Sequence, residues 1–215
     1  MDLIIFDLDG TLIDSKLDLA HAVNATRSDM GLPPLEHELI YSYVGNGAPV
    51  LIRRALGPDA SEQHVEEALA FFLDYYREHM LDFTVLYPGV RETLEKLDNG
   101  NRRLAVLTNK PVRFSAAILD GLGVGQYFFR VYGGNSFEQK KPHPIGVETL
   151  LREAGAKKER ALMVGDSAVD MQTARNAGIP CCGVTYGFQP ESLDANPPDF
   201  VIDQMDQIFA ALQLS

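Results

Sequence analysis

The sequence predicts an α/β fold in which a Rossmann-like parallel-sheet core is interrupted, after its first strand, by an all-helical insertion. From Tyr87 onward, short apolar runs alternate with helical patterns, which is typical of a parallel sheet covered by helices. Between the first strand and that point, only helical patterns occur. We therefore expect the core to comprise residues 1–15 and 84–215, and the helical insertion to comprise residues 16–83.

The N-terminal elements are a buried strand and three helices. The apolar run Leu3–Phe6 predicts the strand, and Leu17–Met30 predicts a helix that Gly31 and the following prolines end. Pro49–Leu56 predicts a shorter helix. Ser61 suits the N-cap of a long helix, because apolar residues then recur at helical spacing. These residues are Val65, Leu69, Phe72, Leu73 and Tyr76.

The elements after residue 84 alternate between helix and strand. Helical stripes are formed by Val90, Leu94 and Leu97, by Ile118, Leu119 and Leu122, and by Val147, Leu150, Leu151 and Ala154. The predicted strands are Leu104–Leu107, Val131–Tyr132, Ala161–Val164, Pro180–Val184 and Phe200–Ile202, and the closing helix is Met205–Leu212. In such a sheet, chemistry is expected at the carboxyl ends of the strands.

Composition and charge restrict the class of protein. The 215 residues are 46% hydrophobic and 23% charged, which suits a globular chain with a sizeable core. A formal net charge of −11 argues against broad binding to nucleic acid or an anionic membrane. No apolar stretch is as long as a membrane span, and no signal-like segment precedes the first strand, so we expect a cytoplasmic protein. We also expect a monomer or a homodimer. The adjacent Cys181 and Cys182 predict no disulfide framework.

Four polar segments fall at predicted strand ends: Asp7-Leu8-Asp9-Gly10-Thr11, Thr108-Asn109-Lys110, Lys140-Lys141-Pro142-His143-Pro144 and Gly165-Asp166-Ser167-Ala168-Val169-Asp170. A carboxylate can attack a phosphoryl group and form an acyl phosphate, which makes Asp7 the candidate nucleophile. Crowded carboxylates need a cation or a proton, and the hard oxygens of Asp166 suit magnesium. These segments also have purely structural interpretations. Thr108-Asn109 is compatible with an ordinary turn, the lysines before the prolines with a solvated loop, and Asp170 with an acid that stabilises a helix N-terminus.

In this order, the four segments resemble the haloacid dehalogenase superfamily of phosphotransferases with an aspartate nucleophile, and within it the phosphoglycolate phosphatase group. The resemblance covers nearly the whole chain and implies a core with a helical cap that closes over the substrate. It implies that Asp9 is the general acid and base, that Thr108 binds phosphate oxygens beside Asn109, and that Lys141 neutralises the transferring phosphoryl group. The implied Mg²⁺ site consists of Asp7, Asp9 through its backbone carbonyl, Asp166, and Asp170, directly or through water.

The helical insertion carries the candidate determinants of specificity. Its segment Tyr43–Pro49 resembles the Val-Gly-Asn-Gly stretch of bacterial phosphoglycolate phosphatases, so Gly45 and Asn46 are candidate substrate contacts. Arg53 is either a cationic contact for the substrate or part of a solvated helix face. Phosphosugar mutase relatives carry an Arg where this chain has Ala48.

We therefore expect a magnesium-dependent phosphatase that acts on a small phosphorylated metabolite, 2-phosphoglycolate, through an aspartyl phosphate. The alternatives are a phosphosugar mutase, whose bisphosphate intermediate needs a second cationic site, and a broad-range sugar phosphatase.

Overall fold

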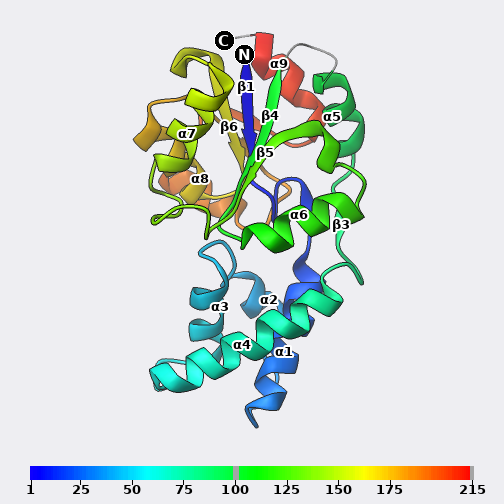
Figure 1. The fold of residues 1–215 in the computed structure, drawn as a ribbon, viewed down its shortest axis with the longest axis vertical. Coiled ribbons are helices and arrows are strands. Elements are labelled where there is room, and N and C mark those ends of the chain that lie inside the picture. Colours follow the sequence, from blue (N-terminus) through cyan, green and yellow to red (C-terminus); the bar gives the residue numbers. More distant parts are fainter. Residues whose placement is uncertain (99–101, 214–215) are drawn as a thin grey trace. The chain divides into compact units, whose positions relative to one another are not determined.

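A computed structural model describes residues 1–98 and 102–213 of the chain. The chain divides into two compact units (Figure 1). The core unit consists of Met1–Asp14 and Leu86–Ser215, and the helical unit consists of Ser15–Val85. No helix among the described residues is long and apolar enough to cross a membrane.

The core unit contains a six-stranded sheet in the order β5-β4-β1-β6-β7-β8, in which every neighbouring pair is parallel. The strands are β1 (Leu3–Phe6), β4 (Arg103–Leu107), β5 (Phe128–Tyr132), β6 (Ala161–Gly165), β7 (Cys181–Val184) and β8 (Phe200–Ile202). Phe6 of β1 pairs with Val106 of β4 on one side and with Val164 of β6 on the other. β1 is buried throughout, as expected of a parallel strand with both faces covered.

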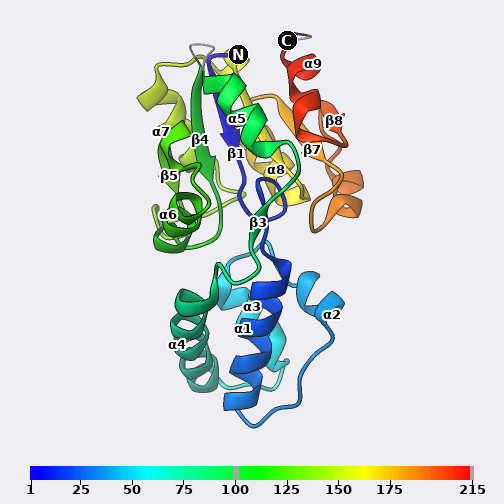
Figure 2. The ribbon, with the colours of Figure 1, turned by 90° about the vertical axis from the view of Figure 1, so that its right-hand side faces the viewer.

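Helices cover both faces of this sheet (Figure 1 and Figure 2). On one face lie α7 (Ile145–Ala154) and α8 (Ala168–Ala177), and on the other lie α5 (Val90–Asp98) and α9 (Ile208–Gln213), while α6 (Val112–Gly121) packs beside β5. Short 3-10 turns occur at Gly125–Tyr127, Lys158–Arg160, Pro190–Ala195 and Met205–Gln207. The apolar side chains of α7 and α8 complete a core cluster with the sheet. This is the predicted α/β architecture.

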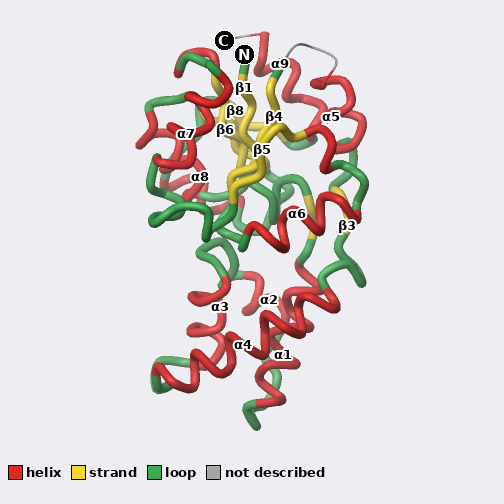
Figure 3. Tube along the Cα trace, viewed as in Figure 1, coloured by secondary structure: helices red, strands yellow, loops and turns green. Residues whose placement is uncertain are grey.

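The helical unit contains α1 (Lys16–Asp29), α2 (His37–Tyr41), α3 (Ala48–Leu56) and α4 (Glu62–His79), drawn in red in Figure 3. Ser61 caps α4 as predicted, because its side chain accepts a hydrogen bond from the backbone of His64. Val65, Phe72 and Tyr76 of the predicted stripe are buried, whereas Leu69 and Leu73 lie at its half-buried margin.

Several elements differ from the sequence-based expectation. The strand predicted at Val131–Tyr132 begins three residues earlier, at Phe128, directly after a 3-10 turn. The five-residue α2 and the short paired strands β2 (Ile13–Asp14) and β3 (Val85–Leu86) were not predicted, since each is too short to show a period. The closing helix starts as a 3-10 turn before it becomes α-helical at Ile208.

Candidate active site

The carboxyl ends of β1, β4 and β6 lie side by side, because these strands are neighbours in the centre of the sheet. Asp7 follows β1, Thr108 follows β4, and Asp166 follows β6. Asp7 N donates a hydrogen bond to Val164 O of β6 at 2.9 Å. Lys141 reaches the same edge from the loop between β5 and α7. The structure therefore brings together the four segments that the sequence places at strand ends.

Lys141 joins the candidate nucleophile to a second buried carboxylate. Its Nζ lies 2.8 Å from Asp7 Oδ1 and 2.6 Å from Asp170 Oδ1. Although burial alone would lower the pKa of Lys141, the charges of Asp170 and Asp7 raise it above its ordinary value. Burial, reinforced by the charge of Asp170, raises the pKa of Asp7 to about 6, and Lys141 opposes this rise. Above that pH, Asp7 is a carboxylate held against an ammonium group, which is the form that a nucleophile requires.

Asp166 is packed against the turn that follows the nucleophile. Gly10 has a φ of +83°, and a Cβ at this position would lie 2.1 Å from Asp166 Oδ2, so only glycine fits here. Phe188 N donates a hydrogen bond to the same oxygen at 2.6 Å. Burial, followed by the charges of Asp170 and Asp7, raises the pKa of Asp166 well above its ordinary value.

Three carboxylates form a candidate metal site. One oxygen from each of Asp7, Asp166 and Asp170 lies within 4.8 Å of the other two, and all three residues are buried. Burial, and after it the like charges of neighbouring carboxylates, raise the pKa of Asp7 and of Asp166. A divalent cation with a preference for oxygen ligands would relieve this repulsion. The residues present therefore fit Mg²⁺.

Asp170 also has the structural role that its position near a helix start indicates. Ser167 donates two hydrogen bonds to Asp170 Oδ2, from its backbone N at 3.2 Å and from its Oγ at 2.7 Å, at the start of α8. Asp170 Oδ1 accepts from Lys141. The carboxylate thus both caps the helix and orients the lysine.

Asp9 is held by a residue to which the sequence analysis assigned no role. Lys110 Nζ donates to Asp9 Oδ1 at 2.9 Å and to Asp9 Oδ2 at 3.1 Å. The two residues are 101 positions apart in the chain. The sequence places Lys110 directly after Thr-Asn at a strand end, which could have marked it as a site residue. It does not show that the carboxylate of Asp9 lies next to this lysine.

Thr108 and Asn109 are both buried at the end of β4. Thr108 Oγ1 accepts a hydrogen bond from Lys110 N at 3.3 Å, which is the turn geometry that the structural interpretation expects. Asn109 Nδ2 donates to Lys141 O at 3.2 Å and so joins the second segment to the third. Their contacts with substrate stay predictions.

A fifth segment, the loop after β7, closes against the site and was also not predicted. Tyr186 OH donates to Thr11 O at 3.0 Å, and Phe188 bonds to Asp166 as described above. A Cβ on Gly187 would lie 2.2 Å from Asp166 Cβ and 2.5 Å from Gly10 O. The close approach of this loop therefore requires glycine at position 187.

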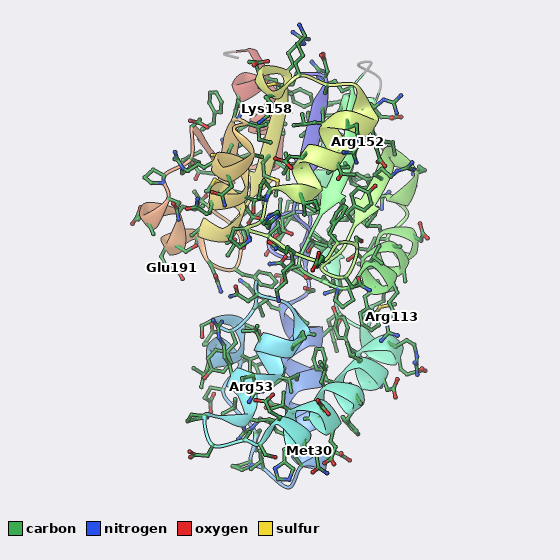
Figure 4. All side chains as sticks on the ribbon, turned by 60° about the vertical axis from the view of Figure 1, so that its left-hand side comes forward. Met30, Arg53, Arg113, Arg152, Lys158 and Glu191 are labelled. Carbon is green, nitrogen blue, oxygen red and sulfur yellow. The ribbon has the colours of Figure 1, made fainter. Side chains whose placement is uncertain are left out.

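The predicted specificity residues lie in the helical unit. Gly45 has a φ of +109°, a conformation that favours glycine, and Asn46 follows it in the turn before α3. Arg53 of α3, labelled in Figure 4, forms an ion pair with Glu62, and its Nη1 donates to Ala60 O at 3.4 Å. Contact of these residues with a substrate stays a prediction.

Residues 4–184 match the family model of the haloacid dehalogenase-like hydrolases. The chain belongs to this family. The resemblance inferred from the four motifs is thereby confirmed.

Individual members of the family are similar over nearly the whole chain. A phosphoglycolate phosphatase from Pseudomonas putida is 44% identical over 209 residues, which cover 94% of this chain and 76% of that protein. A phosphoglycolate phosphatase from Vibrio parahaemolyticus is 40% identical over 220 residues, which cover 99% of this chain and 96% of that protein. The crystal structure of a predicted phosphoglycolate phosphatase from Haemophilus somnus has a TM-score of 0.93 and 35% identity, covering 98% of this chain and 97% of that chain. This haloacid dehalogenase-like hydrolase is an enzyme, a phosphoric monoester hydrolase.

Proposed function

We propose that this hydrolase is a magnesium-dependent phosphatase that acts on 2-phosphoglycolate through an aspartyl phosphate formed on Asp7. The observation that carries the proposal is the buried carboxylate of Asp7, whose Oδ1 lies 2.8 Å from Lys141 Nζ at the carboxyl end of β1. The choice of substrate is supported by relatives of 40% and 44% identity that are named phosphoglycolate phosphatase.

The proposed reaction has two steps at the phosphorus atom. In the first, the Asp7 carboxylate attacks phosphorus, the bond to the ester oxygen breaks, and the Asp9 carboxyl gives its proton to the leaving oxygen. In the second, water loses a proton to Asp9 and attacks the phosphorus of the acyl phosphate, which releases inorganic phosphate and restores the Asp7 carboxylate. The ammonium of Lys141 stabilises the negative charge that both steps concentrate beside it.

Mg²⁺ would be held by the carboxylates of Asp7 and Asp166 and by the backbone carbonyl of Asp9. When bound, it supplies positive charge that neutralises the phosphoryl oxygens. Both oxygens of Asp170 already bond to Lys141 or Ser167, which favours a supporting position for Asp170 behind the ligands.

The proposed substrate is a small anion with phosphate at one end and carboxylate at the other. Thr108 and Asn109 would contact its phosphate at the end of β4. In the helical unit, Gly45 and Asn46 would let the backbone approach the ligand closely, and Arg53 would contact the carboxylate.

A turnover panel tests the proposal. With Mg²⁺, we expect kcat/KM for 2-phosphoglycolate to exceed that for glucose 6-phosphate at least ~10-fold, which is ~1.4 kcal/mol of differential transition-state binding. EDTA should abolish turnover and Mg²⁺ should restore it. Gly45→Val should lower turnover of 2-phosphoglycolate more than that of p-nitrophenyl phosphate. Equal rates across the panel would indicate a broad-range phosphatase, and a preference for the hexose phosphate would favour mutase-like specificity.

A further inference from the structure

The ion pair between Lys110 and Asp9 is the least expected feature of the core unit. The side chain of Lys110 is only 5% exposed and that of Asp9 is 12% exposed. Lysine is rarely buried unless it is paired, and here its ammonium contacts both oxygens of one carboxylate, at 2.9 and 3.1 Å. Two simultaneous contacts restrict the rotation of the Asp9 carboxylate more than a single contact would.

The backbone from which Lys110 extends is itself fixed. Gly134 N donates to Lys110 O at 2.9 Å, and Lys110 N donates to Thr108 Oγ1 at 3.3 Å. A Cβ on Gly133 would lie 2.5 Å from Lys110 O, so the loop after β5 packs directly on this peptide. The lysine is therefore anchored at its root as well as at its ammonium.

The two buried lysines of the site serve different carboxylates. Lys141 bridges Asp7 and Asp170, whereas Lys110 contacts Asp9. We propose that Lys110 is a positioning residue for Asp9: it holds the carboxylate where a proton can pass to or from the reacting oxygen. This inference rests on the proposed function, in which Asp9 is the proton donor and acceptor.

Proton transfer depends on position, because donor and acceptor oxygens must come within hydrogen-bonding reach. A displacement of about 1 Å can lower a rate by about 100-fold. Without Lys110, the Asp9 carboxylate loses an ammonium group that contacts both of its oxygens. The first half-reaction should then slow most for an ester whose leaving oxygen needs a proton.

The leaving group separates this role from a purely structural one. In Lys110→Met, we expect the first-turnover rate of alcohol release from 2-phosphoglycolate to fall at least ~10-fold, and that from p-nitrophenyl phosphate, whose phenolate leaves without a proton, to fall less than about threefold. The KM for 2-phosphoglycolate should change by less than about threefold, because Lys110 is not assigned to binding. Lys110→Arg, which keeps the charge and the donors, should recover part of the loss.

Two further variants complete the test. In an Asp9→Asn background, Lys110→Met should cause no additional loss, because the two residues act as a unit. Lys158→Met is the matched control: Lys158 is exposed in the 3-10 turn before β6, at the opposite end of that strand from Asp166, and is labelled in Figure 4. It should leave both rates unchanged.

Each outcome decides a different claim. Equal losses on the two esters, or an additive loss in the Asp9→Asn background, would show that Lys110 acts on the phosphoryl group or only on the fold, and would overturn the inference. If the wild type does not hydrolyse 2-phosphoglycolate, the proposed substrate is wrong, and the same ratio is measured with whichever alkyl phosphate it turns over. If the wild type hydrolyses no ester, both proposals are wrong.

Discussion

Asp7→Asn should abolish turnover and nevertheless stabilise the metal-free protein. The amide cannot form an acyl phosphate, so catalysis is lost. The same change removes a carboxylate that is buried beside Asp170 and Asp166 and is only partly compensated by Lys141. Removing a functional but unfavourable charge commonly exchanges activity for stability.

The magnitude follows from the pKa of Asp7, which burial raises from 3.8 to about 6. A folded-state pKa above the unfolded value means that the contribution of Asp7 to stability is present below pH 3.8 and is lost as the pH rises to about 6. At ~1.4 kcal/mol for each pKa unit, the loss is about 3 kcal/mol at pH 7.5 and roughly half of that at pH 5. Asparagine is neutral at both pH values, so the variant should gain these amounts.

Urea unfolding in EDTA at the two pH values measures this gain as a difference in the free energy of unfolding. Asp59→Asn, at an exposed site, is the control and should change stability by no more than ~0.5 kcal/mol. Mg²⁺ should then stabilise the wild type more than Asp7→Asn, because the variant lacks one ligand. A variant that is less stable than the wild type in EDTA at pH 7.5 would refute the account of a crowded, uncompensated carboxylate cluster.

The remaining predictions concern other residues of the two units. Asp9→Asn should keep its affinity for Mg²⁺ in a metal titration but lose ~100-fold or more in turnover rate, whereas Asp166→Ala should bind Mg²⁺ more weakly. Rescue of Asp9→Asn by excess Mg²⁺ would contradict this separation of roles. Gly187→Ala should lower stability by ~1–3 kcal/mol and reduce Mg²⁺ affinity, because its Cβ would lie 2.2 Å from Asp166 Cβ; unchanged thermal unfolding would exclude the clash. Asp18→Ala should lower the free energy of unfolding by ~2–3 kcal/mol, because Asp18 accepts hydrogen bonds from Phe83 N, Thr84 N and Thr84 Oγ1. An unchanged free energy of unfolding in a denaturant titration would contradict this prediction.

The long elements and the motif positions were predictable because they follow local rules. Leu3–Phe6 is a continuous apolar run and becomes a buried central strand, and Ser61 precedes a helical stripe and caps α4. Asp7 and Asp166 directly follow such strands, and strand order then brings them together. A local pattern therefore suffices wherever one strand or helix sets the position of the residue.

The contacts that were not predicted are those that depend on two distant segments. Lys110 meets Asp9 only because β4 and β1 are neighbours in register, and Phe188 reaches Asp166 only because β7 lies beside β6. Residue types restrict such pairs but do not identify them. The capping of α8 by Asp170 was foreseen as one option, yet its simultaneous bond to Lys141 required the fold.

Trapping of the phosphorylated enzyme tests directly whether Asp7 is the nucleophile. Enzyme mixed with Mg²⁺ and 2-phosphoglycolate carrying a radioactive phosphoryl group is quenched in acid during turnover, digested, and its labelled peptide identified. We expect label on the peptide that contains Asp7, and none in Asp7→Asn. Label on another residue, or steady hydrolysis with no trapped label and full activity in Asp7→Asn, would contradict it.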